Sequence, residues 1–183
     1  MTITVRVDDV LGFGRPGVDP TERFMDIHAA IQSANGLLWH EPTILVQDIQ
    51  AFPAAVEFIR LESRLGRMSP QVHGWTHAPY HSLPPERLAE DLRWCLDWFD
   101  RELNWLPTKF YSPWGGDTPI MREVAAANGL GLVGACRNET LDRLLLRLRK
   151  GEPPRLLEGT WLWHWWSGSG PISEIADMLT KRS

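Results

Sequence analysis

Short apolar segments alternate with longer segments of helical periodicity along almost the whole of this chain. The apolar segments predict strands at 3–7, 43–46, 71–72, 109–111, 130–135 and 160–166. The periodic segments between them predict helices at 21–34, 52–65, 82–103, 119–128, 141–150 and 172–180. Repeated strand–helix units favour an α/β fold, in which helices cover a parallel sheet.

The length of 183 residues predicts a single domain, residues 1–183, because no linker, repeat or low-complexity segment interrupts this pattern. A net charge of −4, with acids and bases interspersed, provides no basic surface for nucleic acid. No apolar run is long enough to span a membrane. The first predicted strand starts at residue 3, so we expect no signal peptide. Cys95 and Cys136 are far apart, so we expect reduced thiols and a cytoplasmic location. The sequence does not indicate an oligomeric state.

Two histidines, His73 and His77, lie four residues apart, and two adjacent aspartates, Asp8 and Asp9, follow the first predicted strand. Histidines at this spacing can direct both imidazoles at one point. Together with one carboxylate they would form a three-ligand metal site that leaves a position open for water. The alternatives are two unrelated histidines, and an aspartate pair that only caps the following loop.

The candidate polar residues all lie at or just after the ends of predicted strands. This holds for Asp8 and Asp9, for His73, for the segment 111–114 and for His164. In parallel α/β folds the carboxyl ends of the strands meet at one rim, where functional residues gather. The sequence therefore predicts that these residues converge on one site.

Four segments, in this order, resemble the motifs of the polysaccharide deacetylase (NodB-homology) superfamily: Asp8-Asp9, His73-x-x-x-His77, Phe110 to Gly115 and Leu162-Trp163-His164. The resemblance covers residues 3–166. It implies a distorted, incomplete (β/α) barrel of parallel strands with outer helices. It also implies metal-dependent removal of acetyl groups from N-acetylated sugars. Because the chain is short for this fold, we expect a trimmed barrel with small loops.

The resemblance also implies a role for each matching residue. Asp8 would be the general base, and Asp9, His73 and His77 would bind the metal. His164 would be the general acid that protonates the departing amine, although its place between tryptophans is equally compatible with a buried histidine bonded to the backbone. Imidazole nitrogens and a carboxylate oxygen suit zinc, and cobalt or nickel could occupy the same site.

Two residues of the third motif are assigned to the substrate. The backbone N–H of Trp114 would face the developing oxyanion and its side chain would form a wall of the sugar pocket. Tyr111, at the start of the same loop, is assigned to this pocket as well.

The chain departs from the family pattern at three places. The family usually has an arginine where Tyr111 stands, and this arginine holds the catalytic aspartate. The glycine that normally follows the aspartate pair is Val10, and near the later predicted strands there is no aspartate before a tryptophan, as the family's motif requires. Arg6 is a candidate substitute for the arginine because it lies two residues before Asp8, on the same face of the strand. The alternative is that this face points outward and Arg6 is solvated.

The sequence therefore predicts a metal-dependent N-deacetylase of an acetylated amino sugar or glycan, in cytoplasmic glycan or glycolipid-precursor metabolism. One alternative is another amide or glycosidic hydrolase on a similar barrel. The other is a catalytically inactive carbohydrate-binding protein that retains the pocket and its tryptophans. The chain has ten tryptophans, which stack on sugar rings but more often pack in cores.

Overall fold

The computed structural model describes residues 3–10, 19–134, 145–146, 149–150, 160–164 and 170–181. For residues 160–164 it describes the backbone. Most of the predicted helix at 141–150 and the end of the predicted strand at 165–166 lie outside these residues.

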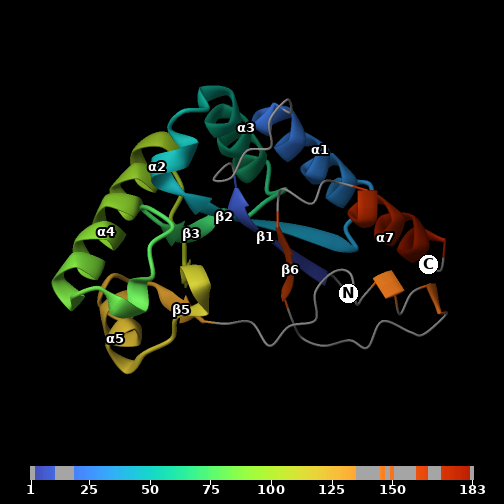
Figure 1. The fold of residues 1–183 in the computed structure, drawn as a ribbon. Coiled ribbons are helices and arrows are strands. Elements are labelled where there is room, and N and C mark those ends of the chain that lie inside the picture. Colours follow the sequence, from blue (N-terminus) through green and yellow to red (C-terminus); the bar gives the residue numbers. More distant parts are fainter. Residues whose placement is uncertain are drawn as a thin grey trace.

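Six strands form one sheet, in the order β5-β4-β3-β2-β1-β6. All neighbouring strands are parallel, and the described sheet begins at β5 and ends at β6 without closing. Helices surround this curved sheet, so the predicted distorted, incomplete (β/α) barrel is confirmed (Figure 1). The strands are β1 (Ile3–Val10), β2 (Leu38–Leu45), β3 (Gln71–Gly74), β4 (Lys109–Tyr111), β5 (Gly131–Val133) and β6 (Thr160–His164).

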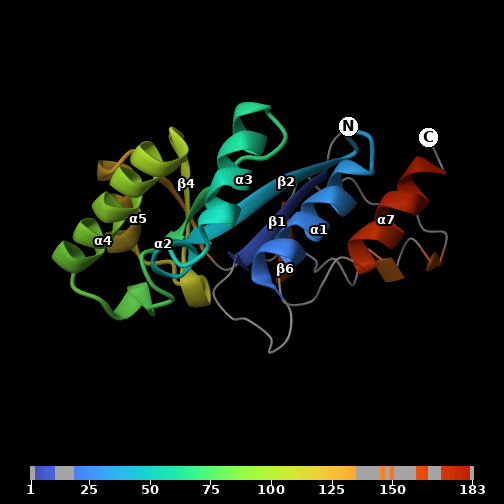
Figure 2. The same ribbon diagram turned by 90° about the horizontal axis from the view of Figure 1, so that it is seen from above.

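The helices α4, α2, α3, α1 and α7 form an arc around the strands, and α5 lies beside α4 (Figures 1 and 2). The inner face of α1 is the one that the helical spacing predicted, since Phe24, Ile27 and Ile31 are fully buried. None of the described helices is both long and apolar enough to cross a membrane. The helices are α1 (Pro20–Gln32), α2 (Val46–Ile49), α3 (Pro53–Arg64), α4 (Pro85–Trp98), α5 (Pro119–Ala127) and α7 (Gly170–Thr180), with shorter turns at Tyr80–Ser82, Phe99–Leu103 and Pro113–Gly115.

Most residues of the four strands β1 to β4 are buried on both faces, but the two faces differ in chemistry. One face is apolar and belongs to the core beneath the helices; it includes Val5, Val7, Ile44, Val72 and Phe110. The opposite face, inside the barrel, is lined by polar residues two positions apart on each strand. These pairs are Arg6 and Asp8 on β1, Glu41 and Thr43 on β2, Gln71 and His73 on β3, and Lys109 and Tyr111 on β4.

Three strands extend further than predicted, and β3 does so at its end, which lies at Gly74. β1 continues to Val10 and so contains the aspartate pair, and β2 begins at Leu38, so that Pro42 lies inside the strand. Val7 pairs with Pro42 but Val10 pairs with Ile44, which gives β1 one extra residue at this point. The missing N–H of a proline is tolerated at such an irregularity. The prediction that β2 starts after Pro42 was therefore wrong. The prediction that it includes Val46 was also wrong, because α2 begins at that residue.

Candidate functional site

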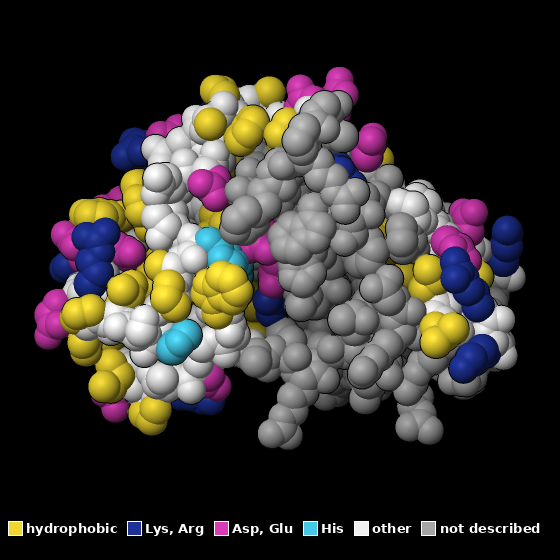
Figure 3. All heavy atoms as spheres, viewed as in Figure 1, with side chains coloured by type: hydrophobic (Ala, Val, Ile, Leu, Met, Phe, Trp, Pro, Cys, Tyr) yellow, Lys and Arg dark blue, Asp and Glu magenta, His cyan; other side chains and the backbone are white. Residues whose placement is uncertain are grey.

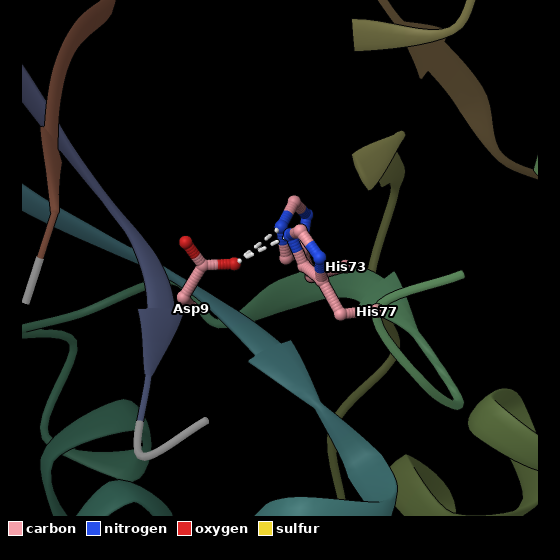
Figure 4. Close-up of side chains that lie close together, drawn as sticks. All are labelled: Asp9, His73 and His77. Atoms are coloured by element: carbon pink, nitrogen blue, oxygen red, sulfur yellow. Dashed lines mark hydrogen bonds and ion pairs between the residues drawn. The ribbon is translucent and has the colours of Figure 1, made fainter. Parts of the chain in front are cut away.

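Asp9, His73 and His77 converge at the carboxyl end of the sheet. The Nε2 atoms of His73 and His77 each lie 3.0 Å from Oδ1 of Asp9, and one potential ligand atom from each residue lies within 4.8 Å of the others. Figure 4 shows both imidazoles directed at the same carboxylate oxygen. Zinc ligands at about 2.0–2.1 Å from one ion lie roughly 3–3.5 Å apart, so these three residues could hold a metal ion.

The hydrogen bond on the other side of His73 determines which of its nitrogens carries the proton. Nδ1 of His73 lies 2.6 Å from the backbone oxygen of Tyr111. A carbonyl oxygen only accepts, so Nδ1 is the protonated nitrogen, and Nε2 of a neutral imidazole presents its lone pair to Asp9. Two acceptors at 3.0 Å repel each other unless a cation or a proton lies between them. The donor set therefore fits a divalent metal.

The irregularity in β1 brings both aspartates of the pair to the site. Neighbouring residues of a regular strand point to opposite faces. Asp9 instead has a left-handed backbone with φ of 56°, so that its carboxylate lies against His73 while Asp8 stays inside the barrel. A left-handed non-glycine residue costs roughly 1–2 kcal/mol, and such strain is typical of functional sites.

The loop that carries His77 is shaped by Gly74 and Tyr80. Gly74 has φ of 133°, and a Cβ at this position would lie 2.6 Å from the Tyr80 ring. The Tyr80 hydroxyl accepts a hydrogen bond from the backbone N–H of Trp75 at 2.9 Å. The loop is therefore packed on a buried phenol, and only glycine fits where it leaves β3.

Asp8 is buried inside the barrel and is held by Arg6 and Thr43. The Arg6 guanidinium donates to both carboxylate oxygens, and Thr43 Oγ1 donates to Oδ1 at 2.9 Å. Burial alone would raise the pKa of Asp8, but the hydrogen bond and charge of Arg6, together with His73 and Thr43, outweigh burial and lower this pKa below its usual value. The predicted contact between Arg6 and Asp8 is thus present, and Arg6 points inward.

Tyr111 lies under the site. Its side chain is 1% exposed, its ring lies 4.3 Å from the Arg6 guanidinium carbon, and its hydroxyl donates to Glu41. Glu41 also accepts from Lys109 Nζ at 2.7 Å. The Tyr111 side chain, which we assigned to the substrate pocket, therefore lies inside the barrel, away from the surface.

Trp114 is 70% exposed and lies beside the metal-site loop. Its ring centre is 4.9 Å from that of His77, and its Nε1 donates to the His77 backbone oxygen at 3.3 Å. In Figure 3 histidine atoms are exposed next to hydrophobic atoms on this face of the molecule. The assignment of Trp114 to the substrate pocket stays a prediction.

His164 is the last residue of β6, and its backbone pairs in register with Asp8. This register brings the fourth motif next to the first, at the same edge of the sheet. The side chain of His164 lies outside the described part of the structure, so its assignment as general acid stays a prediction.

Asp48, and the polar residues deeper inside the barrel such as Glu41, were not predicted from the sequence. Asp48 lies on the four-residue helix α2, where the charges of His77 and Asp9 act on it, and burial raises its pKa. Burial has the opposite effect on a histidine. It lowers the pKa of His77, although the charge of Asp9 acts to raise it. Glu41 could have been found from the alternation of polar residues along Glu41–Thr43, which repeats the Arg6–Asp8 spacing. No comparable pattern marks Asp48.

No protein-family model matches this chain, and no curated protein matches it. Solved structures do match. A family 4 carbohydrate esterase from Streptomyces lividans, in complex with acetate, has a TM-score of 0.70 at 19% identity, over 99% of this chain and 88% of that one. The peptidoglycan deacetylase PdaC from Bacillus subtilis has a TM-score of 0.71 at 16% identity, over 100% of this chain and 83% of that one.

A third structure, BA3943 from Bacillus anthracis, is described as a CE4 family pseudoenzyme. It has a TM-score of 0.70 at 15% identity, over 98% of this chain and 59% of that one. At these identities the likeness shows a shared fold, which is the fold implied by the motif resemblance.

Proposed function

We propose that this chain is a metal-dependent hydrolase that removes the N-acetyl group from an acetylated amino sugar or glycan. The observation that carries the proposal is the convergence of Asp9, His73 and His77 beside a buried Asp8 that is paired with Arg6. The order of the motifs and the fold shared with family 4 carbohydrate esterases support it. We further propose that residues 1–183 form one catalytic domain that acts in the cytoplasm, where the Cys95 thiol would remain reduced.

The metal in this proposal is zinc, held by His73, His77 and Asp9. Two imidazoles and one carboxylate are a common zinc set, and cobalt or nickel fit the same donors. A divalent ion held there would lower the pKa of water and polarise the amide carbonyl.

The other residues move protons and hold the substrate. Asp8 accepts the proton of the attacking water, since its lowered pKa keeps it ionised at neutral pH. His164 donates a proton to the amine as it leaves, because an unprotonated amine is a poor leaving group. Trp114, exposed beside His77, forms a wall for the sugar ring and offers its backbone N–H to the oxyanion.

The test is acetate release from a panel of N-acetylated sugars and oligosaccharides. Release should stop with a chelator and return when zinc is added back. His73→Ala should lose both the metal and the activity, whereas His81→Ala, a change in a neighbouring exposed histidine, should keep both. Activity that survives the chelator and His73→Ala would overturn the proposal.

A second candidate is a carbohydrate-binding protein without catalytic activity. Tyr111 occupies the position of the family arginine, and BA3943, which shares the fold, is a pseudoenzyme. A hollow of about 270 Å³, lined by Trp75, Trp94, Asp97, Trp98 and Arg101, lies next to the loop that carries His77. Aromatic walls with a few polar groups suit a sugar ring. Quenching of tryptophan fluorescence by an oligosaccharide that yields no acetate would favour this candidate.

A further inference from the structure

We propose that Glu41 and Tyr111 are positioning residues: Glu41, held by Lys109, fixes the Tyr111 side chain, and Tyr111 fixes Arg6 against Asp8 and His73 toward Asp9. The inference rests on the proposed function for its kinetic consequences. The contacts between these residues are present whatever the function of the protein.

Glu41 connects strands that are not neighbours in the sheet. It lies on β2, whereas both of its partners, Lys109 and Tyr111, lie on β4, with β3 between them. One carboxylate oxygen accepts from Lys109 Nζ at 2.7 Å and the other accepts from the Tyr111 hydroxyl. The Glu41 side chain therefore crosses the inside of the barrel, where it is 4% exposed.

Three of the contacts of Tyr111 bear on this role, and two of them reach residues of the proposed site. Its hydroxyl is bound by Glu41, its ring lies 4.3 Å from the Arg6 guanidinium carbon, and its backbone oxygen accepts from His73 Nδ1 at 2.6 Å. A guanidinium over an aromatic face is attracted to it and is restricted in orientation. A hydrogen bond to the second nitrogen of a metal-binding histidine fixes its ring and tautomer.

The charges inside the barrel alternate along this chain of contacts. Asp8 is paired with Arg6, Arg6 lies in register with Glu41 on the neighbouring strand, and Glu41 is paired with Lys109. A buried charge needs an opposite charge beside it. Loss of the Glu41 charge would remove the acid that is paired with Lys109 and that lies in register with Arg6.

The experiment compares Glu41→Gln, Tyr111→Phe and the double variant with a control, Glu57→Gln, an exposed acid paired with Arg60. Glu41→Gln keeps the shape of the side chain. It replaces one of the two accepting oxygens by an –NH2 group, which faces either Lys109 or the Tyr111 hydroxyl. Tyr111→Phe keeps the ring and removes the hydroxyl. We expect each single variant to lower kcat about tenfold with KM unchanged, as the change of an outer-shell partner does. The double variant should be no worse than Glu41→Gln alone, because both changes act on the same Tyr111–Glu41 hydrogen bond.

A second readout does not need activity. The affinity of the metal-free protein for zinc, measured from the rise of Tm with zinc concentration, should fall severalfold in both single variants and stay unchanged in Glu57→Gln. If the wild type releases no acetate from any sugar, the proposed function fails while this measurement still tests the positioning role. Should Glu41→Gln not fold, Lys109→Met replaces it, since Lys109 is half-exposed.

Two results would overturn the inference. One is a folded single variant whose kcat and zinc affinity both equal those of the control. The other is a double variant whose loss equals the product of the two single losses, because Glu41 and Tyr111 would then act separately.

Discussion

Arg6 and Asp8, two residues apart on β1, form a two-point ion pair inside the barrel, in which the guanidinium donates to both carboxylate oxygens. The period of a strand places both side chains on one face. Both are buried, so each charge needs the other. Under the proposed function, Arg6 would do what the motif resemblance assigns to an arginine at position 111.

Arg6→Met should lower turnover about 10²-fold and leave the metal bound, because Asp8 would lose the partner that orients it. The pKa of Asp8 should rise, since burial would no longer be opposed by Arg6. The acid limb of the kcat/KM profile should therefore move to higher pH. Full activity with an unmoved limb would show that Asp8 is held in another way.

Asp9→Asn and Asp8→Asn should separate the metal ligand from the base. We expect Asp9→Asn to lower the zinc content in elemental analysis, because a neutral amide replaces the carboxylate that both histidines face. Asn also tolerates the left-handed backbone at position 9. Asp8→Asn should keep zinc and lose about 10²–10⁴-fold in rate, as expected when a general base is removed. Equal loss of zinc in both variants would contradict these roles.

Strand periodicity accounts for most of what the sequence predicted correctly. The alternation of apolar segments with segments of helical spacing was enough to predict the parallel sheet. The ends of β1, β3 and β4 bring the candidate residues together. The inward orientation of Arg6 was left open, because a short strand with polar residues on one face can turn that face either way.

The errors have local physical causes. Pro42 looked like a residue that precedes a strand, but it lies at the point where β1 has an extra residue. Tyr111 looked like a pocket residue because its loop carries Trp114, yet Glu41, seventy positions earlier, holds its hydroxyl inside the barrel. Such a contact depends on which strands face each other across the barrel, and the spacing of residues along one chain does not contain it.

Gly74→Ala should destabilise the fold and weaken zinc binding. Its methyl group would meet the Tyr80 ring at 2.6 Å and the Thr76 backbone oxygen at 2.9 Å, so the loop before His77 would have to move. Gly66→Ala is the matched control, because Gly66 also has a positive φ but has open space around it. We expect the control to cost about 1 kcal/mol and to keep zinc affinity, and Gly74→Ala to cost more in urea unfolding. Equal costs would show that the loop does not depend on this contact.

The last prediction concerns stability in acid and arises from a buried histidine pair remote from the proposed site. Nδ1 of His28 lies 2.9 Å from Nδ1 of His40, and Nε2 of His28 lies 3.1 Å from Glu62, which also pairs with Arg67. Within the described part of the chain, Nε2 of His40 has no hydrogen-bond partner. An imidazolium at position 40 would thus have no acceptor at that nitrogen.

Burial, followed by the charge of His28, holds the pKa of His40 well below its usual 6.5, and burial also lowers that of His28 in spite of Glu62. The unfolded chain therefore binds protons first as the pH falls through about 6.5. The free energy of unfolding should be constant with respect to these groups above pH 7 and should decrease below 6.5, by up to about 1.4 kcal/mol per pH unit for each histidine that stays neutral in the folded state. Urea unfolding of the wild type and of His40→Leu between pH 5 and 7.5 measures this slope. His40→Leu should be less stable at pH 7.5 yet lose less stability on acidification, whereas parallel curves for the two proteins would show that His40 does not bind a proton on unfolding.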